Sequence, residues 1–301
     1  MSLSKVLYEQ LGFEFTMKDA YNVVPDKPKT TIRARIYDNL GIKFERVKKG
    51  LYRTIRGDNQ CILIEGNGRD LNFLEDNSID CILTDHPWLD SKSNKGGNRD
   101  FSSSYSCFRY ELEDFKEKAR VLKEGHFLVE VLPAENESNY EYLYEIKQMA
   151  KECGLLYYAK VPWIKGNFVS NTGRKSKNSE DIIIFSKGKA RELRKDVKKT
   201  LKTGNKSFMS GTNGMLPTDF NIEPVKKKEK IHESEKPVQL YEEILNYITM
   251  ENELILDQYA GSGNVGLASL RKNRSCILIE IIKENVEKIR QRLNASLALD
   301  Y

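Results

Sequence analysis

An acidic residue, a histidine, a proline and a large aromatic residue follow one another one residue after an apolar run. The run covers residues 79–83 and is typical of a buried strand, and the four residues are Asp85, His86, Pro87 and Trp88. In open α/β sheets, ligands bind outside the carboxyl ends of the strands, where these residues would lie. A carboxylate and a carbonyl can accept hydrogen bonds from an amino group, and an aromatic ring can stack on a heterocycle. The segment therefore predicts a pocket for a flat, amino-bearing ring.

A glycine-rich turn follows a second apolar strand much later in the chain. Asp257 ends this predicted strand, and Gly261 and Gly263 precede a predicted helix. Glycines let a ligand approach the backbone at the amino end of a helix. Glu280 ends the next predicted strand, where a carboxylate can accept both hydroxyls of a ribose. The pattern predicts a nucleoside-containing cofactor, and taken alone it fits NAD, S-adenosylmethionine or a mere tight turn. Because the apolar strand stops at Asp257, four residues before the first glycine, a dinucleotide is disfavoured.

Four further segments occur in a fixed order around these two motifs. A strand end at residues 65–67 precedes the tetrapeptide, and a strand lead-in at 121–127 and an acidic, apolar strand at 180–187 follow it. A Lys-Pro segment at 234–240 comes shortly before the glycine turn. Together these segments resemble the β class of the DNA amino-methyltransferases, the N6-adenine and N4-cytosine family with a D/N/S-P-P-Y/F/W tetrapeptide. The resemblance covers roughly residues 60–298.

The resemblance implies a Rossmann-like, S-adenosylmethionine-dependent methyltransferase sheet and site-specific methylation of the exocyclic amine of a base flipped out of DNA. In the family, the aspartate and the next carbonyl hold the amine and the aromatic residue stacks on the base. The implied catalytic residues are Asp85, His86, Pro87 and Trp88. The residues implied to bind S-adenosyl-L-methionine are Asn67, Lys236, Asp257, Tyr259, Gly261, Gly263 and Glu280. The leading aspartate favours adenine N6 over cytosine N4, whose enzymes often carry serine there, and the chemistry needs no metal.

The sequence departs from the family pattern at several positions. His86 replaces the first proline of the tetrapeptide, which keeps the carbonyl but removes some stiffness, although Pro87 still favours an extended His86. We interpret the imidazole as a satisfied wall residue in preference to a proton-handling group. Gln258 and Tyr259 replace a proline and a phenylalanine of the cofactor loop, and Asn67 replaces an aspartate. A catalytically weak or inactive DNA-binding homologue is therefore an alternative to an active enzyme.

Strands and helices alternate over residues 59–301, the part of the chain that carries these motifs. Apolar runs predict strands over 61–64, 79–85, 127–132, 155–164, 181–185, 254–257 and 276–280. Helical patterns cover 71–74, 112–122, 138–153, 236–248, 264–270 and 283–297. This alternation is typical of an α/β fold with a largely parallel sheet.

Two segments interrupt the alternation. Residues 91–106 are rich in Ser, Asn and Gly, and we expect them to form a lid that becomes ordered only with DNA. Residues 187–231 are basic and lie where the family keeps its target-recognition region. We expect this insertion to bind DNA through Lys195, Lys198, Lys199 and Lys202.

Residues 1–58 form a pattern of their own. Three short helices are predicted over 4–11, 17–24 and 28–40, and a hairpin over 42–47 and 51–55. This order resembles a winged-helix-like DNA-binding module, whose third helix would present Arg33 and Arg35 to a groove. A helical cap packed on the larger domain is the alternative.

The distribution of charge supports a polyanionic partner. Residues 1–60 contain 12 Lys/Arg and 7 Asp/Glu, and residues 187–230 contain 13 and 5. The whole chain has a net charge of +5, so the remaining residues carry −8. Two basic segments on an acidic core are expected of a protein that binds nucleic acid. The alternative interpretation is that these lysine-rich loops are merely solvated.

The overall composition narrows the class of protein. The chain has 301 residues, no apolar run that would span a bilayer and no signal-peptide pattern, so we expect a cytoplasmic protein. Its five scattered cysteines are expected to be buried thiols, and three distant histidines without a CxxC motif disfavour structural zinc. The expected partner is double-stranded DNA. A methyltransferase of RNA or free nucleotides and a non-catalytic DNA-binding protein are alternatives. The sequence leaves open the recognition sequence, a cognate restriction enzyme and the oligomeric state.

Overall fold

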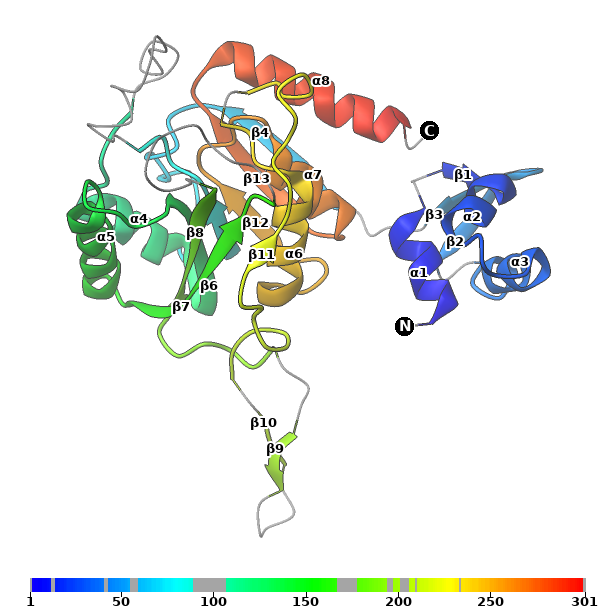
Figure 1. Ribbon diagram of the computed structural model, residues 1–301, viewed down its shortest axis with the longest axis horizontal. Coiled ribbons are helices and arrows are strands. Elements are labelled where there is room, and N and C mark those ends of the chain that lie inside the picture. Colours follow the sequence, from blue (N-terminus) through cyan, green and yellow to red (C-terminus); the bar gives the residue numbers. More distant parts are fainter. Residues whose placement is uncertain are drawn as a thin grey trace.

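The computed structural model describes residues 2–11, 14–40, 43–54, 59–88, 107–166, 178–193, 197–200, 206–208, 210–232 and 234–299. In this part of the chain, a central sheet has the strand order β11-β7-β8-β6-β5-β12-β13-β4 (Figure 1). Its strands are β4 (Cys61–Glu65), β5 (Ile79–Thr84), β6 (Leu122–Pro133), β7 (Leu155–Ile164), β8 (Ser179–Lys187), β11 (Phe220–Asn221), β12 (Leu254–Asp257) and β13 (Ser275–Glu280).

The sheet is parallel except at one strand. Strand β8 runs antiparallel to both β6 and β7, whereas the pairs β11–β7, β6–β5, β5–β12, β12–β13 and β13–β4 are parallel. The carboxyl ends of β4, β5, β12 and β13 therefore meet at one edge of the sheet. This confirms the predicted α/β fold with a largely parallel, Rossmann-like sheet.

Helices cover both faces of the sheet. One face carries α4 (Leu112–Val121) and α5 (Tyr140–Glu152), and the other carries α6 (Val238–Ile248), α7 (Asn264–Arg271) and α8 (Lys283–Leu299) (Figure 1). Side chains of β5 alternate between the two layers. Cys81 and Leu83 belong to the core cluster that includes Leu240 of α6, while Ile82 belongs to the cluster that includes Phe115 of α4. The central strand is thus buried on both sides, as its continuous apolar run predicted.

The first 54 residues form a small module with a core of its own. It consists of α1 (Leu3–Gln10), β1 (Glu14–Thr16), α2 (Met17–Val23), α3 (Lys29–Tyr37), β2 (Phe44–Lys48) and β3 (Leu51–Thr54). The strands pair antiparallel in the order β1-β3-β2. Ile32 and Ile36 of α3, four residues apart, are buried with Phe44 of β2. The predicted start of the second helix at residue 17 is confirmed, and Thr16 precedes it as the N-cap of a capping box with Asp19.

Several sequence-based expectations about elements were wrong or incomplete. Residues 71–74 form turns and no helix: the Leu74 N–H donates to the Leu71 carbonyl at 2.9 Å in a single turn, and Arg120 also donates to the carbonyls of Leu71 and Leu74. Strand β1 was not predicted. Within the basic insertion, β9 (Val197–Thr200) and β10 (Lys206–Phe208) form an antiparallel pair, which was also not predicted. Residues 91–106, the predicted lid, lie outside the described residues.

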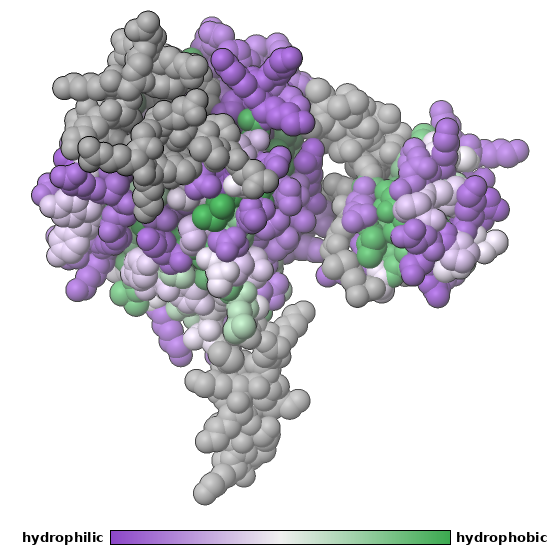
Figure 2. Space-filling view, in the orientation of Figure 1, coloured by the Kyte–Doolittle hydropathy of each residue, from purple (hydrophilic) through white to green (hydrophobic). Residues whose placement is uncertain are grey.

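The surface of the described part is mainly polar on the side drawn in Figure 2. Hydrophilic residues predominate over the outer side of the N-terminal module and over the larger domain. None of the helices in the described ranges has the length and apolar composition required to cross a bilayer.

Candidate active site

The tetrapeptide and the glycine turn lie next to each other although 172 residues separate Asp85 from Asp257. Their strands β5 and β12 are parallel neighbours, with Cys81 opposite Ile255. At the carboxyl ends of these strands, the Thr84 hydroxyl donates a hydrogen bond of 3.0 Å to Asp257 Oδ1. The sheet therefore brings together the two motifs that were expected to act together.

The Asp85 carboxylate lies in a cluster with three other charged groups. Lys236 Nζ donates a short hydrogen bond to Asp85 Oδ2 and lies 3.4 Å from Glu180 Oε2. Lys165 Nζ also contacts Glu180, at 2.7 Å. The side chain of Asp85 is 18% exposed and that of Lys236 is 9% exposed. The mostly buried Asp85 carboxylate thus lies at the end of β5, and the Lys236 ammonium compensates its charge.

Burial changes the protonation of this cluster. It raises the pKa of Asp85 to about 6, and the nearby Lys236 ammonium opposes that rise. Burial also disfavours the charged form of Lys236, but Asp85 and Glu180 outweigh it and raise the pKa of Lys236 above its ordinary value. Lys236 was expected to bind the cofactor, and in the structure its ammonium contacts Asp85. Sequence reasoning did not identify Glu180 as a site residue, because its distance from Lys236 depends on how β8 packs in the sheet.

The His86 side chain points away from solvent into an aromatic cluster. The residue is 1% exposed, and its ring centroid lies 3.9 Å from that of Tyr110. His86 Nε2 lies 2.9 Å from the Tyr142 hydroxyl, and Nδ1 lies 3.8 Å from Glu130 Oε2. Glu130 in turn forms a buried ion pair with Lys118. The contacts place His86 in the wall of the site, but only Nε2 has a hydrogen-bond partner, so the ring is not fully satisfied as interpreted, and its partners were not predicted.

Pro87 and Trp88 shape a tight turn. The Trp88 N–H donates to the carbonyl of His86 at 2.8 Å, and the Phe108 N–H donates to the carbonyl of Pro87 at 3.0 Å. Trp88 is half-buried and forms an isolated bridge with Phe108. The turn thus holds the aromatic ring next to the strand end and leaves part of it accessible.

The glycine turn has a conformation that side chains would disturb. Gly261 and Gly263 have φ values of +51° and +75°, in the left-handed region. A Cβ atom at Gly263 would come within 2.7 Å of Ile289 in α8. Tyr259 is half-buried, and its ring lies 5.5 Å from that of Phe108. The turn and the tetrapeptide therefore share an aromatic neighbour.

Two carboxylates flank the glycine turn. Glu280 accepts hydrogen bonds of 2.8 Å from the N–H groups of Gly261 and Ile282, and burial raises its pKa. Asp257 is 3% exposed, and burial raises its pKa to about 7. Both acids lie at carboxyl ends of neighbouring strands, as expected for residues that bind a polar cofactor there.

The strand end of β4 packs closely against the glycine turn. A Cβ atom at Gly68 would come within 1.9 Å of the Gln258 carbonyl oxygen, and Gln258 Nε2 donates to the Gly68 carbonyl at 2.6 Å. Asn67 is exposed beside this contact, and its Oδ1 accepts from the Arg69 N–H. The segment around Asn67 is thus anchored to the turn through Gly68.

A second network attaches residues 235–236 to the helices after the turn. Arg292 of α8 donates to Glu235 Oε1 at 2.7 Å and to Asn264 Oδ1 at 2.6 Å. Asn264 Nδ2 donates to the Lys236 carbonyl at 2.7 Å. These contacts fix the backbone of Lys236, whose side chain contacts Asp85. Sequence reasoning missed this network because Arg292 looked like one more basic residue of an exposed helix.

The structure describes the side chains of only two of the predicted DNA-binding residues, Arg33 and Arg35. Arg33 and Arg35 are exposed on α3. Arg33 donates to the Tyr21 hydroxyl at 3.2 Å, and Arg35 pairs with Asp38 at 2.8 Å. The side chains of Lys195, Lys198, Lys199 and Lys202 lie outside the described residues.

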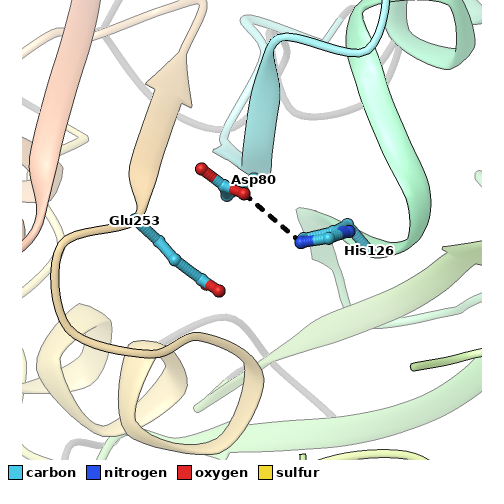
Figure 3. A group of neighbouring side chains, drawn as sticks. All are labelled: Asp80, His126 and Glu253. Carbon is cyan, nitrogen blue, oxygen red and sulfur yellow. Dashed lines mark ion pairs between the residues drawn. The ribbon is translucent and has the colours of Figure 1, made fainter. Parts of the chain in front are cut away.

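Asp80, His126 and Glu253 gather at the opposite, amino-terminal edge of the sheet (Figure 3). Cationic side chains already contact all three. Lys123 pairs with Asp80 at 2.8 Å, and Arg191 lies 2.7 Å from both His126 Nε2 and Glu253 Oε2. These contacts occupy side-chain atoms that would have to coordinate a metal. We therefore interpret the group as a structural link between β5, β6 and the start of β12.

The sequence was compared with protein-family models and with known proteins. The sequence model of the N6_N4_Mtase family, described as DNA methylase, matches residues 79–291. The type II methyltransferase M.HpaI of Haemophilus parainfluenzae is 28% identical over 233 residues, covering 75% of this chain and 71% of that protein.

Solved structures show the shared fold. The M1.HpyAVI–SAM complex matches with a TM-score of 0.57 and 21% identity, covering 78% of this chain and 100% of that one. The cytosine-N4-specific PvuII DNA methyltransferase matches with a TM-score of 0.54 and 18% identity, covering 80% of this chain and 93% of that one.

Proposed function

This chain belongs to the N6/N4 family of DNA methylases, and from that membership we propose that it methylates the N6 amine of adenine in duplex DNA with S-adenosyl-L-methionine. The observation that carries the proposal is the position of Asp85. Its carboxylate lies at the end of β5, next to the Thr84–Asp257 hydrogen bond that joins the tetrapeptide to the glycine turn. One edge of the sheet thus offers an acceptor for an amine beside a cofactor loop.

The residues at the glycine turn fit the proposed cofactor. Gly261 and Gly263 leave the backbone open at the start of α7, and Asp257 and Glu280 present carboxylates on either side. We assign S-adenosyl-L-methionine to these residues together with Asn67, Tyr259 and Lys236. When bound, the cofactor supplies an electrophilic sulfonium methyl group.

The protein's own task is to make a poor nucleophile reactive. The lone pair of an exocyclic amine is delocalised into the base, so the amine attacks slowly in water. In our proposal, Asp85 and the His86 carbonyl accept hydrogen bonds from the two N–H bonds, which favours a tetrahedral nitrogen and frees the lone pair. The His86 carbonyl already accepts from the Trp88 N–H, and its second lone pair can accept from the substrate amine.

The remaining parts of the site hold the base. Trp88 is half-buried beside the turn and is assigned to stack on the face of the base. A base within a duplex cannot reach a pocket at the end of a sheet, so the target base must be flipped out. Lys236 stabilises the ionised form of Asp85, which is the form that accepts two hydrogen bonds.

We propose that DNA is held by the basic segments outside the sheet. The exposed Arg33 and Arg35 on α3 support a DNA-binding role for residues 1–58. The net charge of residues 187–230 supports the same role for the insertion. Relatives such as M.HpaI are named type II methyltransferases, which supports a search for a cognate restriction enzyme of this protein.

The base can be identified in DNA from cells that express the protein. We expect nucleoside analysis to detect N6-methyladenine, methylation-sensitive sequencing to place it within one sequence context, and the modification to disappear in cells that express Asp85→Ala. N4-methylcytosine would replace the adenine assignment with the cytosine one. An unmodified genome, together with no methyl transfer to RNA or nucleotides, would favour a DNA-binding protein without activity.

A further inference from the structure

His86 occupies the position at which the family tetrapeptide carries its first proline, and its side chain is enclosed by residues from three elements. Tyr110 precedes α4, Glu130 lies in β6 and Tyr142 lies in α5. The imidazole has no exposed surface, and the tetrapeptide is thus attached to the helical layer by one side chain. A proline ring at this position could not make these polar contacts.

The contacts favour one tautomer of the neutral His86 ring. The Tyr142 hydroxyl oxygen accepts a hydrogen bond from the Tyr110 N–H at 2.9 Å, so its own proton is available to His86 Nε2. We infer that Nε2 is the acceptor and that Nδ1 carries the proton of the neutral ring, since a protonated Nδ1 turns its N–H toward the Glu130 carboxylate. Nδ1 faces Glu130 across 3.8 Å, too far for a direct hydrogen bond.

The charges around the ring favour its neutral form. Burial lowers the pKa of His86, Glu130 opposes this, and the Lys118 ammonium adds to it. Glu130 is already compensated by Lys118 and also accepts a hydrogen bond from the Tyr110 hydroxyl at 3.1 Å. His86 therefore has no counter-ion of its own that would stabilise an imidazolium.

We propose that His86 is a positioning residue whose buried imidazole, hydrogen-bonded to Tyr142 and packed against the tilted ring of Tyr110, fixes the direction of its own carbonyl. A proline restricts the backbone through its ring, whereas here the restriction comes from a side chain anchored at its far end. The proposal rests on the proposed function, because the carbonyl matters only if it accepts the substrate amine.

This role differs from proton handling. The ring faces Tyr110, Tyr142 and Glu130, while the Asp85 carboxylate contacts Lys236. The neutral ring already accepts one hydrogen bond from Tyr142, and these contacts give it no group on the substrate side with which to exchange a proton. His86 should therefore act through its carbonyl, with no ionisation of its own in the reaction.

Replacements that keep or lose the contact with Tyr142 provide the kinetic test. The carboxamide of Gln reaches the place of Nε2, and that of Asn reaches only the place of Nδ1. With wild-type protein shown to be active, His86→Asn and His86→Ala should lower kcat about 100-fold, since misplacing a catalytic group by 1 Å costs about that much. The kcat of His86→Gln should be at least about tenfold higher than that of His86→Ala. KM and cofactor affinity should change little.

Other kinetic results would overturn the proposal. Equal losses in His86→Gln and His86→Ala, at matched thermal stability, would show that the contact with Tyr142 does not position the carbonyl. Loss of an ionisation from the pH profile in either variant would show that His86 transfers a proton. A failure of the proposed function looks different, because wild-type protein would then transfer no methyl group.

The tautomer can be measured without activity. The chain has three histidines, so 15N-histidine NMR can resolve them, and the signals missing in His86→Gln identify His86. We expect an unprotonated Nε2, a protonated Nδ1 and no titration near the ordinary pKa of 6.5. Tyr142→Phe should shift the Nε2 signal and leave His126 and His232 unchanged. A protonated Nε2, or an unchanged signal in Tyr142→Phe, would contradict the proposal.

Discussion

At the scale of single residues, the site combines a raised carboxylate pKa with a compensating ammonium group. Asp85 must be ionised to accept hydrogen bonds from both Lys236 and the substrate amine, yet burial raises its pKa to about 6. Lys236 limits that rise by direct contact. Asp85 and Lys236 together therefore set the pH range in which the site can bind an amine.

We predict that kcat/KM falls as the pH is lowered through about 6, because Asp85 is then protonated and loses acceptor capacity. Lys236→Met removes a group that lowers this pKa, so the acidic limb should move to higher pH. A pH–rate profile of both proteins on duplex DNA checks this. An acidic limb at the same pH in both proteins would disprove the assignment to Asp85.

The ion pair behind His86 provides a prediction about stability. Lys118 and Glu130 are both fully buried and contact each other at 2.5 Å. Lys118→Met should lower the free energy of unfolding by about 3–5 kcal/mol, because it leaves Glu130 charged and uncompensated. Urea unfolding measures the change. The double variant Lys118→Met/Glu130→Leu should be more stable than Lys118→Met, and a double variant of equal or lower stability would argue against the pair.

The identities of these charged and aromatic partners could not be predicted from the sequence. Asp85 and Trp88 were recognised because they are adjacent in the chain and follow an apolar run. Glu130 and Tyr142 lie inside a strand and a helix that look ordinary in the sequence. Their approach to His86 depends on how β6 and α5 pack, and no local pattern encodes that packing.

At the scale of elements, longer strands of the central sheet were easier to predict than short elements. The bounds of β7 and β12 agree with the prediction at both ends, because each is an apolar run that stops at turn residues. Short elements were harder, since three residues of β1 carry no periodicity. Leu71 and Leu74 are apolar residues three positions apart. This spacing occurs in a helix, but it also occurs in a turn that buries both leucines, as here.

The contact between the β4 strand end and the glycine turn can be tested with two matched glycines. Gly68→Ala should weaken binding of S-adenosyl-L-methionine and lower stability, because its Cβ would overlap the Gln258 carbonyl oxygen. Gly66→Ala is the control, because its Cβ would make ordinary contacts at 3.7 Å or more. Calorimetric titration and thermal unfolding compare the two. Equal behaviour of both variants would show that this close approach is unimportant for the cofactor.

At the scale of the whole molecule, catalysis and DNA binding are assigned to different parts of the chain. The sheet holds the carboxylates and the glycine turn, while basic residues are concentrated in residues 1–60 and 187–230. The family and the fold were evident from motifs in the sequence. The division at residue 58 and the role of the small module stay predictions, because the comparisons match the larger domain.

We predict that charge reversal on α3 weakens DNA binding without affecting the cofactor. Lys29→Glu together with Arg33→Glu should reduce the slope of log K against log salt concentration by about 1 for each DNA phosphate that the variant no longer neutralises. Lys151→Glu on α5, also exposed, serves as the control. Fluorescence anisotropy at several salt concentrations measures the slopes. Identical slopes for the α3 variant and the control would favour a helical cap.

The basic insertion is tested in the same way. Charge reversal at Lys195, Lys198, Lys199 and Lys202 should also reduce the salt dependence, because these lysines are expected to neutralise phosphates. An unchanged slope would remove the insertion from the DNA-binding surface.

The most direct test of the account is transfer of a labelled methyl group from S-adenosyl-L-methionine to duplex DNA by wild-type protein and by Asp85→Ala. We predict label in adenine N6 with the wild type and a rate lower by about 100-fold to 1,000-fold in the variant, which loses one acceptor of the amine. Binding of S-adenosyl-L-methionine by the variant should persist and serves as the folding control. Label transferred at the wild-type rate by Asp85→Ala would contradict the account.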